Sequence, residues 1–274
     1  MKIDQRVGII GGSGWLGRAM AQAALSTGTL TAGNLTISSR SGLGDALRDS
    51  GAYWTSNNQE LVEQSDLVIL SVRPAQFGQI TADMSGKLVV SVMASISCND
   101  IAAHTGASRI VRAMPNAAAA IRKSFTPWYR TKDVSPDDQV DVQAFFAACG
   151  EPSETRSESD IDYCAVMTGT GAAFPSLLAE AMIADAIARG LEPDFAMKAA
   201  KGVICNASQL LANPKESSAR IVREMIDYGG LTATALQTML ARGFNEAVSA
   251  GFEAALARGM KFAAEANRRN DTNG

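Results

Sequence analysis

The sequence has a single histidine, His104, and little else that builds a metal or nucleophilic centre. His104 lies in an ordinary helical pattern with no cysteine or carboxylate cluster beside it, so we expect it to be core or surface filler. The four cysteines, Cys98, Cys149, Cys164 and Cys205, are far apart and form no CxxC pair. This spacing predicts buried small side chains in a reducing compartment. Metal, histidine acid–base and Ser-His-Asp chemistry are therefore disfavoured.

An excess of positive charge is also missing. The formal net charge of −3 disfavours nucleic acid and anionic membranes as partners, because both attract a basic surface. No apolar run reaches the roughly 18 residues of a membrane helix. Lys2, Asp4 and Arg6 interrupt the start before any signal-peptide pattern develops. We expect a cytoplasmic protein with a small-molecule substrate, and a hydrophobic content of 46% is enough for a core.

A glycine turn near the start of the chain is the strongest positive signal. The apolar run Val7–Ile10 predicts a buried strand, and the residues from Arg18 onward predict a helix. Between them, Gly12 permits a sharp turn, Gly14 allows a pyrophosphate to approach the backbone, and Gly17 allows close helix packing. A GxGxxG sequence between a strand and a helix is typical of a dinucleotide-binding fold.

The two halves of the chain have different patterns. In the first half, short β-rich runs alternate with helical stretches, which predicts a mostly parallel, doubly wound α/β sheet of the Rossmann type. The predicted strands include 35–39, 67–72, 88–92, 109–114, 124–129 and 152–156, and a helix is predicted over 136–148.

From about residue 159 the strand signals stop and alanine-rich helical windows follow one another. They cover 172–189, 193–212, 217–225, 232–241 and 244–262. Several of these helices are apolar over most of their circumference, and such a helix must be buried on all sides. We therefore predict a Rossmann domain over 1–158, an all-α domain over 159–266 that forms a homodimer, and a disordered tail over 267–274.

The end of the second predicted strand indicates which dinucleotide binds. An acidic residue usually holds the ribose 2′-hydroxyl of NAD at this point, whereas arginine accommodates the 2′-phosphate of NADP. The segment 38–41 is Ser-Ser-Arg-Ser, with no acid. Hydroxyls beside a guanidinium suit a phosphate, so Ser39 and Arg40 favour NADP(H) over NAD and over S-adenosylmethionine. The chain also lacks the YxxxK pair of short-chain dehydrogenases, because Tyr129 and Lys132 have the wrong spacing.

Further sequence blocks follow the predicted strands. Ser71-Val-Arg-Pro74, Ser91 to Ile96, and Met114-Pro-Asn116 come at strand ends, where an open α/β sheet binds its ligand. Later, Thr168 to Phe174 and Gly229 to Thr232 each contain a Gly/Thr turn that opens a helix. Such turns expose amide and hydroxyl groups that suit a carboxylate, although each is equally expected of a plain helix N-cap.

Together these blocks resemble the pyrroline-5-carboxylate reductase family over nearly the whole chain. The family has a GxGxMA-like turn, an (S/A)VKP strand end, an MPN turn, and GSGPA and SPGGTT helix starts, in this order and spacing. Gly243-Phe244 matches its GGF sequence. The resemblance implies a Rossmann domain, a helical domain that interlocks with a partner subunit, and NADPH-dependent reduction of 1-pyrroline-5-carboxylate to proline.

The resemblance also implies roles for individual residues. It assigns to the cofactor Gly12, Ser13, Gly14, Trp15, Leu16, Ser39, Arg40, Asn58, Val72, Arg73, Pro74, Ala94 and Asn116. Thr170 and the backbone amides of Gly230 and Leu231 are expected to hold the substrate carboxylate. Thr232 is expected to act in catalysis by orienting the imine nitrogen. No strong general acid is required, because a cyclic imine is readily protonated, and placing the nicotinamide near the imine carbon is sufficient.

Departures from the family pattern leave alternatives open. The first loop is one residue longer and carries Trp15, Arg73 replaces lysine, Ala172 replaces a proline, and Asp227 replaces a serine close to the expected carboxylate site. At an effective dielectric near 20, an inward Asp227 about 4 Å from a substrate carboxylate would cost several kcal/mol. The same scaffold acting on another cyclic imine or a carbonyl compound is therefore an alternative, and a non-enzymatic NADP-binding protein is a third.

Overall fold

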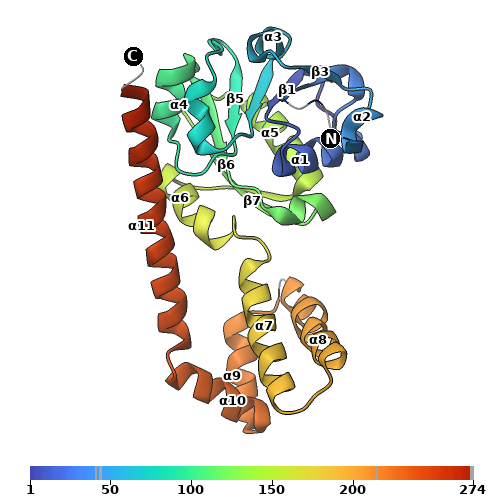
Figure 1. Ribbon diagram of the computed structural model, residues 1–274, viewed down its shortest axis with the longest axis vertical. Coiled ribbons are helices and arrows are strands. Elements are labelled where there is room, and N and C mark those ends of the chain that lie inside the picture. The colour runs from blue at the N-terminus through green and yellow to red at the C-terminus, as the bar shows by residue number, and fades with distance from the viewer. Residues whose placement is uncertain (41, 43–44, 214, 272–274) are drawn as a thin grey trace. The chain divides into compact units, whose positions relative to one another are not determined.

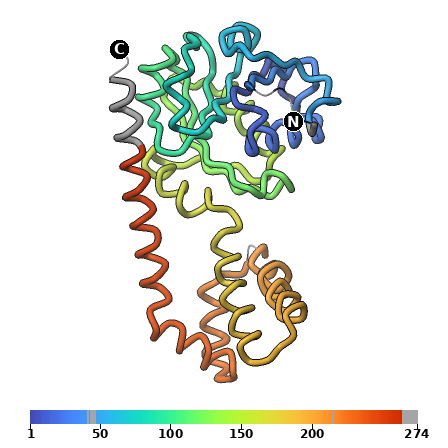
Figure 2. Tube along the Cα trace, viewed as in Figure 1, coloured from blue at the N-terminus to red at the C-terminus, as the bar shows by residue number. Residues whose placement is uncertain are grey.

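The computed structural model describes residues 1–40, 42, 45–213 and 215–271 (Figures 1 and 2). The chain divides into two compact units. Residues 1–171, with the C-terminal residues from Ala255 on, form the first unit, and Ala172–Ala254 form the second.

The first unit is built on a sheet that has eight strands within the described residues, in the order β3-β2-β1-β4-β5-β6-β7-β8 (Figure 1). Neighbours are parallel throughout except that β6 and β7 are antiparallel. The strands are β1 (Val7–Ile10), β2 (Leu35–Ser38), β3 (Tyr53–Thr55), β4 (Leu67–Leu70), β5 (Leu88–Ser91), β6 (Arg109–Ala113), β7 (Ser124–Arg130) and β8 (Gly150–Glu154). The predicted mostly parallel α/β fold is confirmed.

Helices cover both faces of this sheet, which explains why its central strands are apolar without alternation. In β4, Leu67 and Ile69 enter a core shared with α1 and α5, whereas Val68 and Leu70 enter a second core with α3 and α4. The helices of this unit are α1 (Trp15–Ser26), α2 (Asp45–Arg48), α3 (Asn58–Glu63), α4 (Cys98–Thr105), α5 (Pro136–Cys149) and α6 (Glu158–Met167). Strand β3 is missing from the sequence prediction because it is short and lies at the sheet edge with Tyr53 half exposed.

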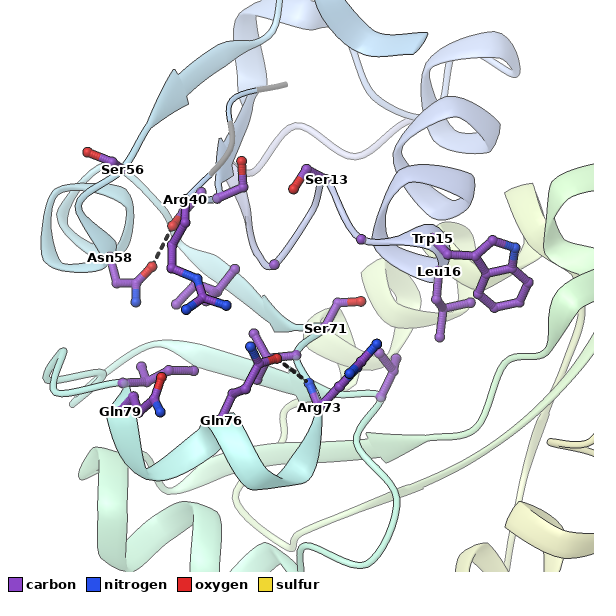
Figure 3. Close-up of a pocket in the computed structure, with 18 residues that line it drawn as sticks. Ser13, Trp15, Leu16, Arg40, Ser56, Asn58, Ser71, Arg73, Gln76 and Gln79 are labelled. Carbon is purple, nitrogen blue, oxygen red and sulfur yellow. Dashed lines mark hydrogen bonds between the residues drawn. The ribbon is translucent and has the colours of Figure 1, made fainter. Parts of the chain in front are cut away.

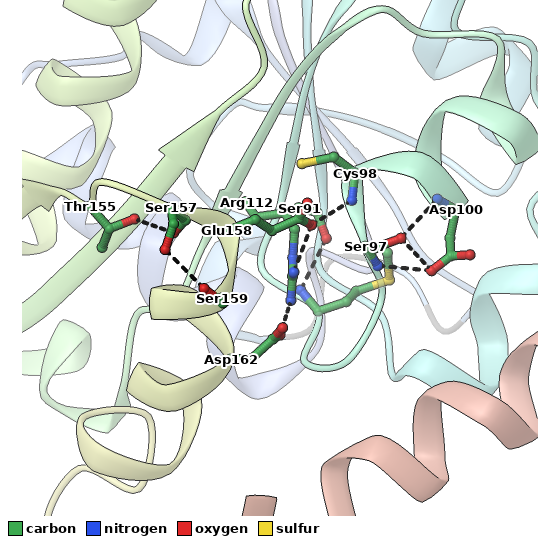
Figure 4. A network of polar contacts seen from close by, with 11 residues as sticks. Ser91, Ser97, Cys98, Asp100, Arg112, Thr155, Ser157, Glu158, Ser159 and Asp162 are labelled. Atoms are coloured by element: carbon green, nitrogen blue, oxygen red, sulfur yellow. Dashed lines mark hydrogen bonds and ion pairs between the residues drawn. The ribbon is translucent and has the colours of Figure 1, made fainter.

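Helix α6 belongs to the first unit, whereas the predicted boundary assigns it to the helical half. A buried ion-pair network connects α6 to β6 (Figure 4). Arg112 of β6 is only 2% exposed, and its guanidinium lies 2.8 Å from Glu158 Oε1 and 2.7 Å from Asp162 Oδ1, both on α6. Burial alone would lower the pKa of Arg112, but hydrogen bonds to Asp162 and Glu158 outweigh it and raise the pKa above its usual value. The charged guanidinium thus ties α6 to the sheet.

The second unit is helical. It contains α7 (Ala173–Ala188), α8 (Pro193–Lys201), α9 (Ser218–Tyr228), α10 (Leu231–Ala241) and the first part of α11 (Phe244–Asp271). The helix predicted over 193–212 is interrupted, because a π-turn (Gly202–Asn206) and a 3₁₀ turn (Ala207–Ala212) follow α8. Gly202 and the β-branched pair after it are weak helix formers, which accounts for the break.

The C-terminal end also differs from the prediction. Helix α11 continues as far as Asp271, although a disordered tail is predicted from residue 267. No glycine or proline interrupts residues 260–271, so the helical pattern extends further than the polar composition suggests. Residues 272–274 lie outside the described residues. None of the helices in the described part of the chain has the length and hydropathy needed to cross a bilayer.

A bidentate ion pair joins the starts of β1 and β4 and makes stability depend on pH. Arg6 donates from Nη2 to Asp66 Oδ1 at 2.8 Å, and from Nε to Oδ2 at 3.1 Å. These bonds lower the pKa of Asp66 below its usual value. Its stabilising contribution is therefore present above the unfolded-state pKa of about 3.9 and is lost as the pH falls through the lower folded-state pKa.

We expect Asp66→Asn to lower the melting temperature by about 1–3 °C at pH 6, since both partners are partly exposed. The difference from wild type should shrink as the pH falls below 4. Thermal unfolding between pH 3 and pH 7 measures it, with the exposed Asp133→Asn as the control. A difference that is constant over this range would contradict the assignment.

Candidate functional site

The loop after β1 makes a tight turn because Gly11, Gly12 and Gly14 have no side chain. Gly11 adopts φ +81°, and a Cβ on it would lie 2.5 Å from the carbonyl oxygen of Ser71. The residue with positive φ is therefore Gly11, which precedes the Gly12 to which the sequence assigned the sharp turn. Gly12 instead makes room for Ile37, because its Cβ would lie 2.7 Å from Ile37 Cγ2. A Cβ on Gly17 would lie 2.8 Å from Gly12 Cα, so α1 packs against the loop as predicted.

Helix α1 begins at the open side of this loop. Gly14 is its N-cap in extended conformation (φ −61°, ψ 160°), and no side chain caps the helix. The first amide groups of a helix lack intrahelical acceptors, and the helix dipole adds partial positive charge at this end. Here α1 presents those amides to a pocket, which suits the pyrophosphate of a dinucleotide.

A pocket of about 540 Å³ lies at the carboxyl ends of β1, β2 and β4 (Figure 3). The 3₁₀ turn η2 (Pro74–Gln79) forms its opposite wall. Its lining consists of Ile10, Gly11, Ser13, Gly14, Trp15, Leu16, Ser38, Ser39, Arg40, Ser56, Asn58, Ser71, Val72, Arg73, Gln76, Gln79, Ile80 and Val92. Two arginines and no carboxylate are among these residues, so the pocket favours an anionic ligand.

Hydroxyl groups beside Arg40 are held by neighbouring side chains. Ser38 donates a hydrogen bond to Asn58 Oδ1 (Figure 3). Ser39 donates to the carbonyl of Gly42 at 2.6 Å and accepts from Trp54 Nε1 at 3.1 Å. Arg40 itself is exposed and forms no ion pair within the described ranges, so its guanidinium keeps its donors for a ligand.

The structure brings together most of the residues predicted to bind the cofactor. Ser13, Gly14, Trp15, Leu16, Ser39, Arg40, Asn58, Val72 and Arg73 all line the pocket. Gly12, Pro74, Ala94 and Asn116 do not belong to the lining. Gly12 supports the turn from behind, and the amide of Asn116 is used in contacts within the protein. Cofactor contact at these four positions stays a prediction.

Several lining residues received no cofactor role from the sequence, although Ser38 and Ser71 lie in sequence blocks that it singled out. Ser38 ends β2 and Ser71 follows β4. Parallel strands bind ligands at their carboxyl ends, so the position of both residues indicates a ligand contact. Gln76 and Gln79 have no such signal, since they lie on a short 3₁₀ turn without a recognisable pattern. Gln76 Oε1 accepts a hydrogen bond from the Arg73 amide at 3.2 Å and so stabilises the start of that turn.

The predicted substrate residues fall into two groups, one in each unit. Thr170 belongs to the first unit, where its Oγ1 is buried and has no hydrogen-bond partner in the part of the chain that the structure describes. The others lie in the second unit, around the turn between α9 and α10. Asp227 is exposed near the end of α9, Gly230 is the N-cap of α10, and Leu231 and Thr232 form the exposed first turn of α10.

The remaining candidate reactive groups lie outside the pocket lining. His104 contacts the carbonyl of Ile80 through Nε2 at 2.7 Å and packs on Phe77, in keeping with a filler role. Burial raises the pKa of both the Cys98 and the Cys149 thiols to about 12, which makes them unreactive. Cys205 is exposed on this chain, so the prediction that all cysteines are buried is wrong. No His, Cys, Asp and Glu cluster suited to a metal occurs among the described residues.

Two family models match the chain. The model described as pyrroline-5-carboxylate reductase dimerisation matches residues 158–262, and the model described as NADP oxidoreductase coenzyme F420-dependent matches residues 6–95. A pyrroline-5-carboxylate reductase of Synechocystis is 28% identical over 209 residues, covering 75% of this chain and 78% of that protein. One from Arabidopsis thaliana is 26% identical over 270 residues, covering 96% and 94%.

Solved structures share the fold. Plasmodium falciparum pyrroline carboxylate reductase with NADP bound superposes with a TM-score of 0.83 at 21% identity, covering 96% of this chain and 100% of that one. The corresponding Coxiella burnetii reductase has a TM-score of 0.86 at 22% identity, covering 95% and 99%. A reductive aminase from Aspergillus terreus is more distant, with a TM-score of 0.55 at 17% identity, covering 97% and 95%.

Proposed function

We propose that the chain is a member of the pyrroline-5-carboxylate reductase family and that it reduces C=N bonds with NADPH. Its first candidate reaction is the reduction of 1-pyrroline-5-carboxylate to proline. The observation that carries the cofactor assignment is the pocket behind the glycine turn, which contains Arg40 and Arg73 and no carboxylate. The relatives carry the assignment of the substrate class.

The residues of the pocket fit a dinucleotide phosphate. The uncapped first turn of α1 offers amide groups for the pyrophosphate, and Arg40 with the neighbouring hydroxyls suits a 2′-phosphate. When bound, NADPH supplies the hydride for the reduction. The protein's part is to orient both reactants and to exclude water, because a protonated imine is already electrophilic.

Residues on the turn between α9 and α10 supply the proposed substrate contacts. Thr232 donates or accepts a hydrogen bond at the imine nitrogen and so fixes the face of the C=N bond. In the second unit, the amides of Gly230 and Leu231 bind the carboxylate. The Thr170 hydroxyl of the first unit is proposed separately as a substrate contact. No side chain caps the start of α10, which supports this role for its first amides.

Asp227 and Tyr228 favour a second candidate, namely the same reaction on a different imine. Both residues are exposed at the end of α9, and Asp227 stands where the family pattern has a neutral serine. A carboxylate near this turn repels an anionic substrate and attracts a cationic one. The fold shared with a reductive aminase is compatible with such a substrate.

The helical unit supports the proposal of a homodimer. Helix α7 is almost entirely apolar yet has no buried residue in the single chain, and Leu177 and Phe195 are exposed by 71% and 61%. A second copy of the chain would cover this surface, in line with the dimerisation model that matches 158–262. For the cellular location we propose the cytoplasm, where four unpaired thiols stay reduced.

The test is NADPH oxidation with a panel of imines, measured as kcat/KM for each. The panel contains pyrroline-5-carboxylate, piperideine carboxylates and uncharged pyrrolines. A preference for pyrroline-5-carboxylate supports the proline assignment, whereas a preference for an uncharged or cationic imine contradicts it and supports the second candidate. Tight NADPH binding without turnover of any imine would indicate a non-enzymatic NADP-binding protein.

We expect Thr232→Val to lower kcat/KM for the preferred imine by about 10- to 100-fold, which corresponds to a lost hydrogen bond to a charged group. The affinity for NADPH should not change. Thr234→Val is the matched control, because Thr234 lies on the same helix two residues away and is likewise exposed. Equal turnover and KM for Thr232→Val and wild type would remove Thr232 from the site.

A further inference from the structure

We propose that Asn116 is a positioning residue, which fastens the loop 168–171 to the carboxyl end of β6 and thereby places the Thr170 hydroxyl. The proposal rests on the reductase function proposed above, in which Thr170 contacts the substrate. It gives Asn116 a role different from the cofactor contact that the family resemblance implies.

Both ends of the Asn116 amide are used within the first unit. Its Oδ1 accepts a hydrogen bond from the Ala118 amide at 2.9 Å and so caps the 3₁₀ turn η3 (Ala117–Ile121). Its Nδ2 donates to the carbonyl oxygen of Thr168 at 2.9 Å. The backbone amide of Asn116 donates to Ser124 Oγ at 3.0 Å. The side chain is therefore buried and oriented toward the loop, and Asn116 does not line the pocket.

The loop lies closely against the end of β6, with little room to shift. A Cβ on Gly169 would lie 2.5 Å from the Ala165 carbonyl oxygen and 3.2 Å from Met114 Cγ. Gly171 has φ +58°, and its Cβ would lie 3.4 Å from the backbone nitrogen of Ala117. Two glycines thus allow the loop to approach the turn that holds Asn116.

Thr170 lies between these two glycines, and its hydroxyl has no partner among the described residues. Its Oγ1 is buried, and no hydrogen bond from the described residues satisfies it. A buried hydroxyl without a partner is unfavourable by about 1–3 kcal/mol, so its presence needs a reason. In the proposed reductase function the substrate supplies the missing partner, and the bond from Asn116 to Thr168 fixes where the hydroxyl lies.

The first test is Asn116→Asp. The aspartate carboxylate can still accept the hydrogen bond from the Ala118 amide. It has no N–H to donate to the Thr168 carbonyl, and it places a negative charge beside that oxygen. We expect kcat/KM for the preferred imine to fall about tenfold and the Kd for NADPH to stay within about twofold. The matched control is Asn34→Asp, since Asn34 makes the same kind of bonds, from Nδ2 to the carbonyls of Ile3 and Gln5, before the amino end of β2. Its kcat/KM should not change.

A double-mutant cycle with Thr170→Val separates positioning from general structural damage. Removing an unpaired hydroxyl should not destabilise the fold, yet it should lower kcat/KM about tenfold in the wild-type background. In the Asn116→Asp background the same change should lower it by less than about threefold, because the hydroxyl is already displaced. Additive effects would overturn the proposal. So would a weaker NADPH affinity of Asn116→Asp with an unchanged KM for the imine.

Hydrogen exchange distinguishes a failure of this proposal from a failure of the proposed function. The amides of Thr168, Gly169 and Gly171 are all hydrogen-bonded within the helix end and loop. In Asn116→Asp they should exchange at least about tenfold faster than in wild type or Asn34→Asp. If the wild type reduces no imine, faster exchange in Asn116→Asp still supports the proposal that Asn116 holds the loop 168–171 in place. Unchanged exchange overturns it whatever the activity.

Discussion

Arg40→Ala will weaken NADPH binding by about 10- to 100-fold and leave NADH binding within about twofold. The two cofactors differ only in the 2′-phosphate, and a hydrogen bond to a charged group contributes roughly 1.5–3 kcal/mol. Arg40 lines the pocket beside Ser39 at the end of β2 and has no ion-pair partner among the described residues, so its guanidinium is available to that phosphate. Fluorescence titration with each cofactor measures the effect.

The control is Arg18→Ala, which removes the same charge from the first turns of α1 at a position outside the pocket lining. It should alter neither affinity by more than about twofold at physiological salt, where exposed charges are screened. If Arg40→Ala weakens both cofactors equally, Arg40 contacts a part that they share. If it weakens neither, the assignment of NADP(H) to the end of β2 is wrong.

Arg112→Met will lower the free energy of unfolding by about 3 kcal/mol. Breaking a buried ion pair by removing one partner typically has an effect of 3–5 kcal/mol, and the lower end applies because Asp162 is half exposed and can be rehydrated. Glu158 accepts hydrogen bonds from the Cys98 amide and from Arg112, so the change leaves it with the Cys98 amide alone of these two donors. Denaturant unfolding of both proteins gives the difference.

Arg130→Met is the matched control. Arg130 pairs with Glu154 at 2.9 Å, but both side chains are partly exposed, and exposed pairs contribute about 0–1 kcal/mol. A loss for Arg130→Met as large as that for Arg112→Met would show that burial does not set the energy of these pairs. A further variant in which Glu158 and Asp162 are also made apolar should recover part of the loss, because no charge then stays unpaired.

The central strands could be predicted because they are buried on both faces and consist of apolar runs. Strand β3 could not, since its pairing with β2 at the sheet edge makes it a strand without an apolar pattern of its own. The GxGxxG sequence located the turn but does not include Gly11, the residue that adopts positive φ. The packing of Ser71 against Gly11 and of Ile37 against Gly12 distinguishes the two glycines, and no sequence pattern reports these contacts.

The site residues also divide into those that the sequence could indicate and those that depend on contacts distant along the chain. Gly14, Ser39 and Arg40 were predicted from their place along the chain, and the other cofactor residues were implied by the family resemblance. Gln76 and Gln79 enter the pocket through a 3₁₀ turn, whose residues have no periodicity to recognise. The role of Asn116 depends on a contact with Thr168, 52 residues later, and no local pattern in the sequence reports a contact of that range.

The apolar helices of the second unit link the stability of this chain to mass action. Leu231 is 94% exposed and α7 and α9 bury no residue in the single chain, so their folding gains little hydrophobic free energy without a second copy. In the proposed homodimer, dissociation and unfolding of the helical unit form one equilibrium. The melting temperature of that dimer depends on the subunit concentration, so dilution lowers it.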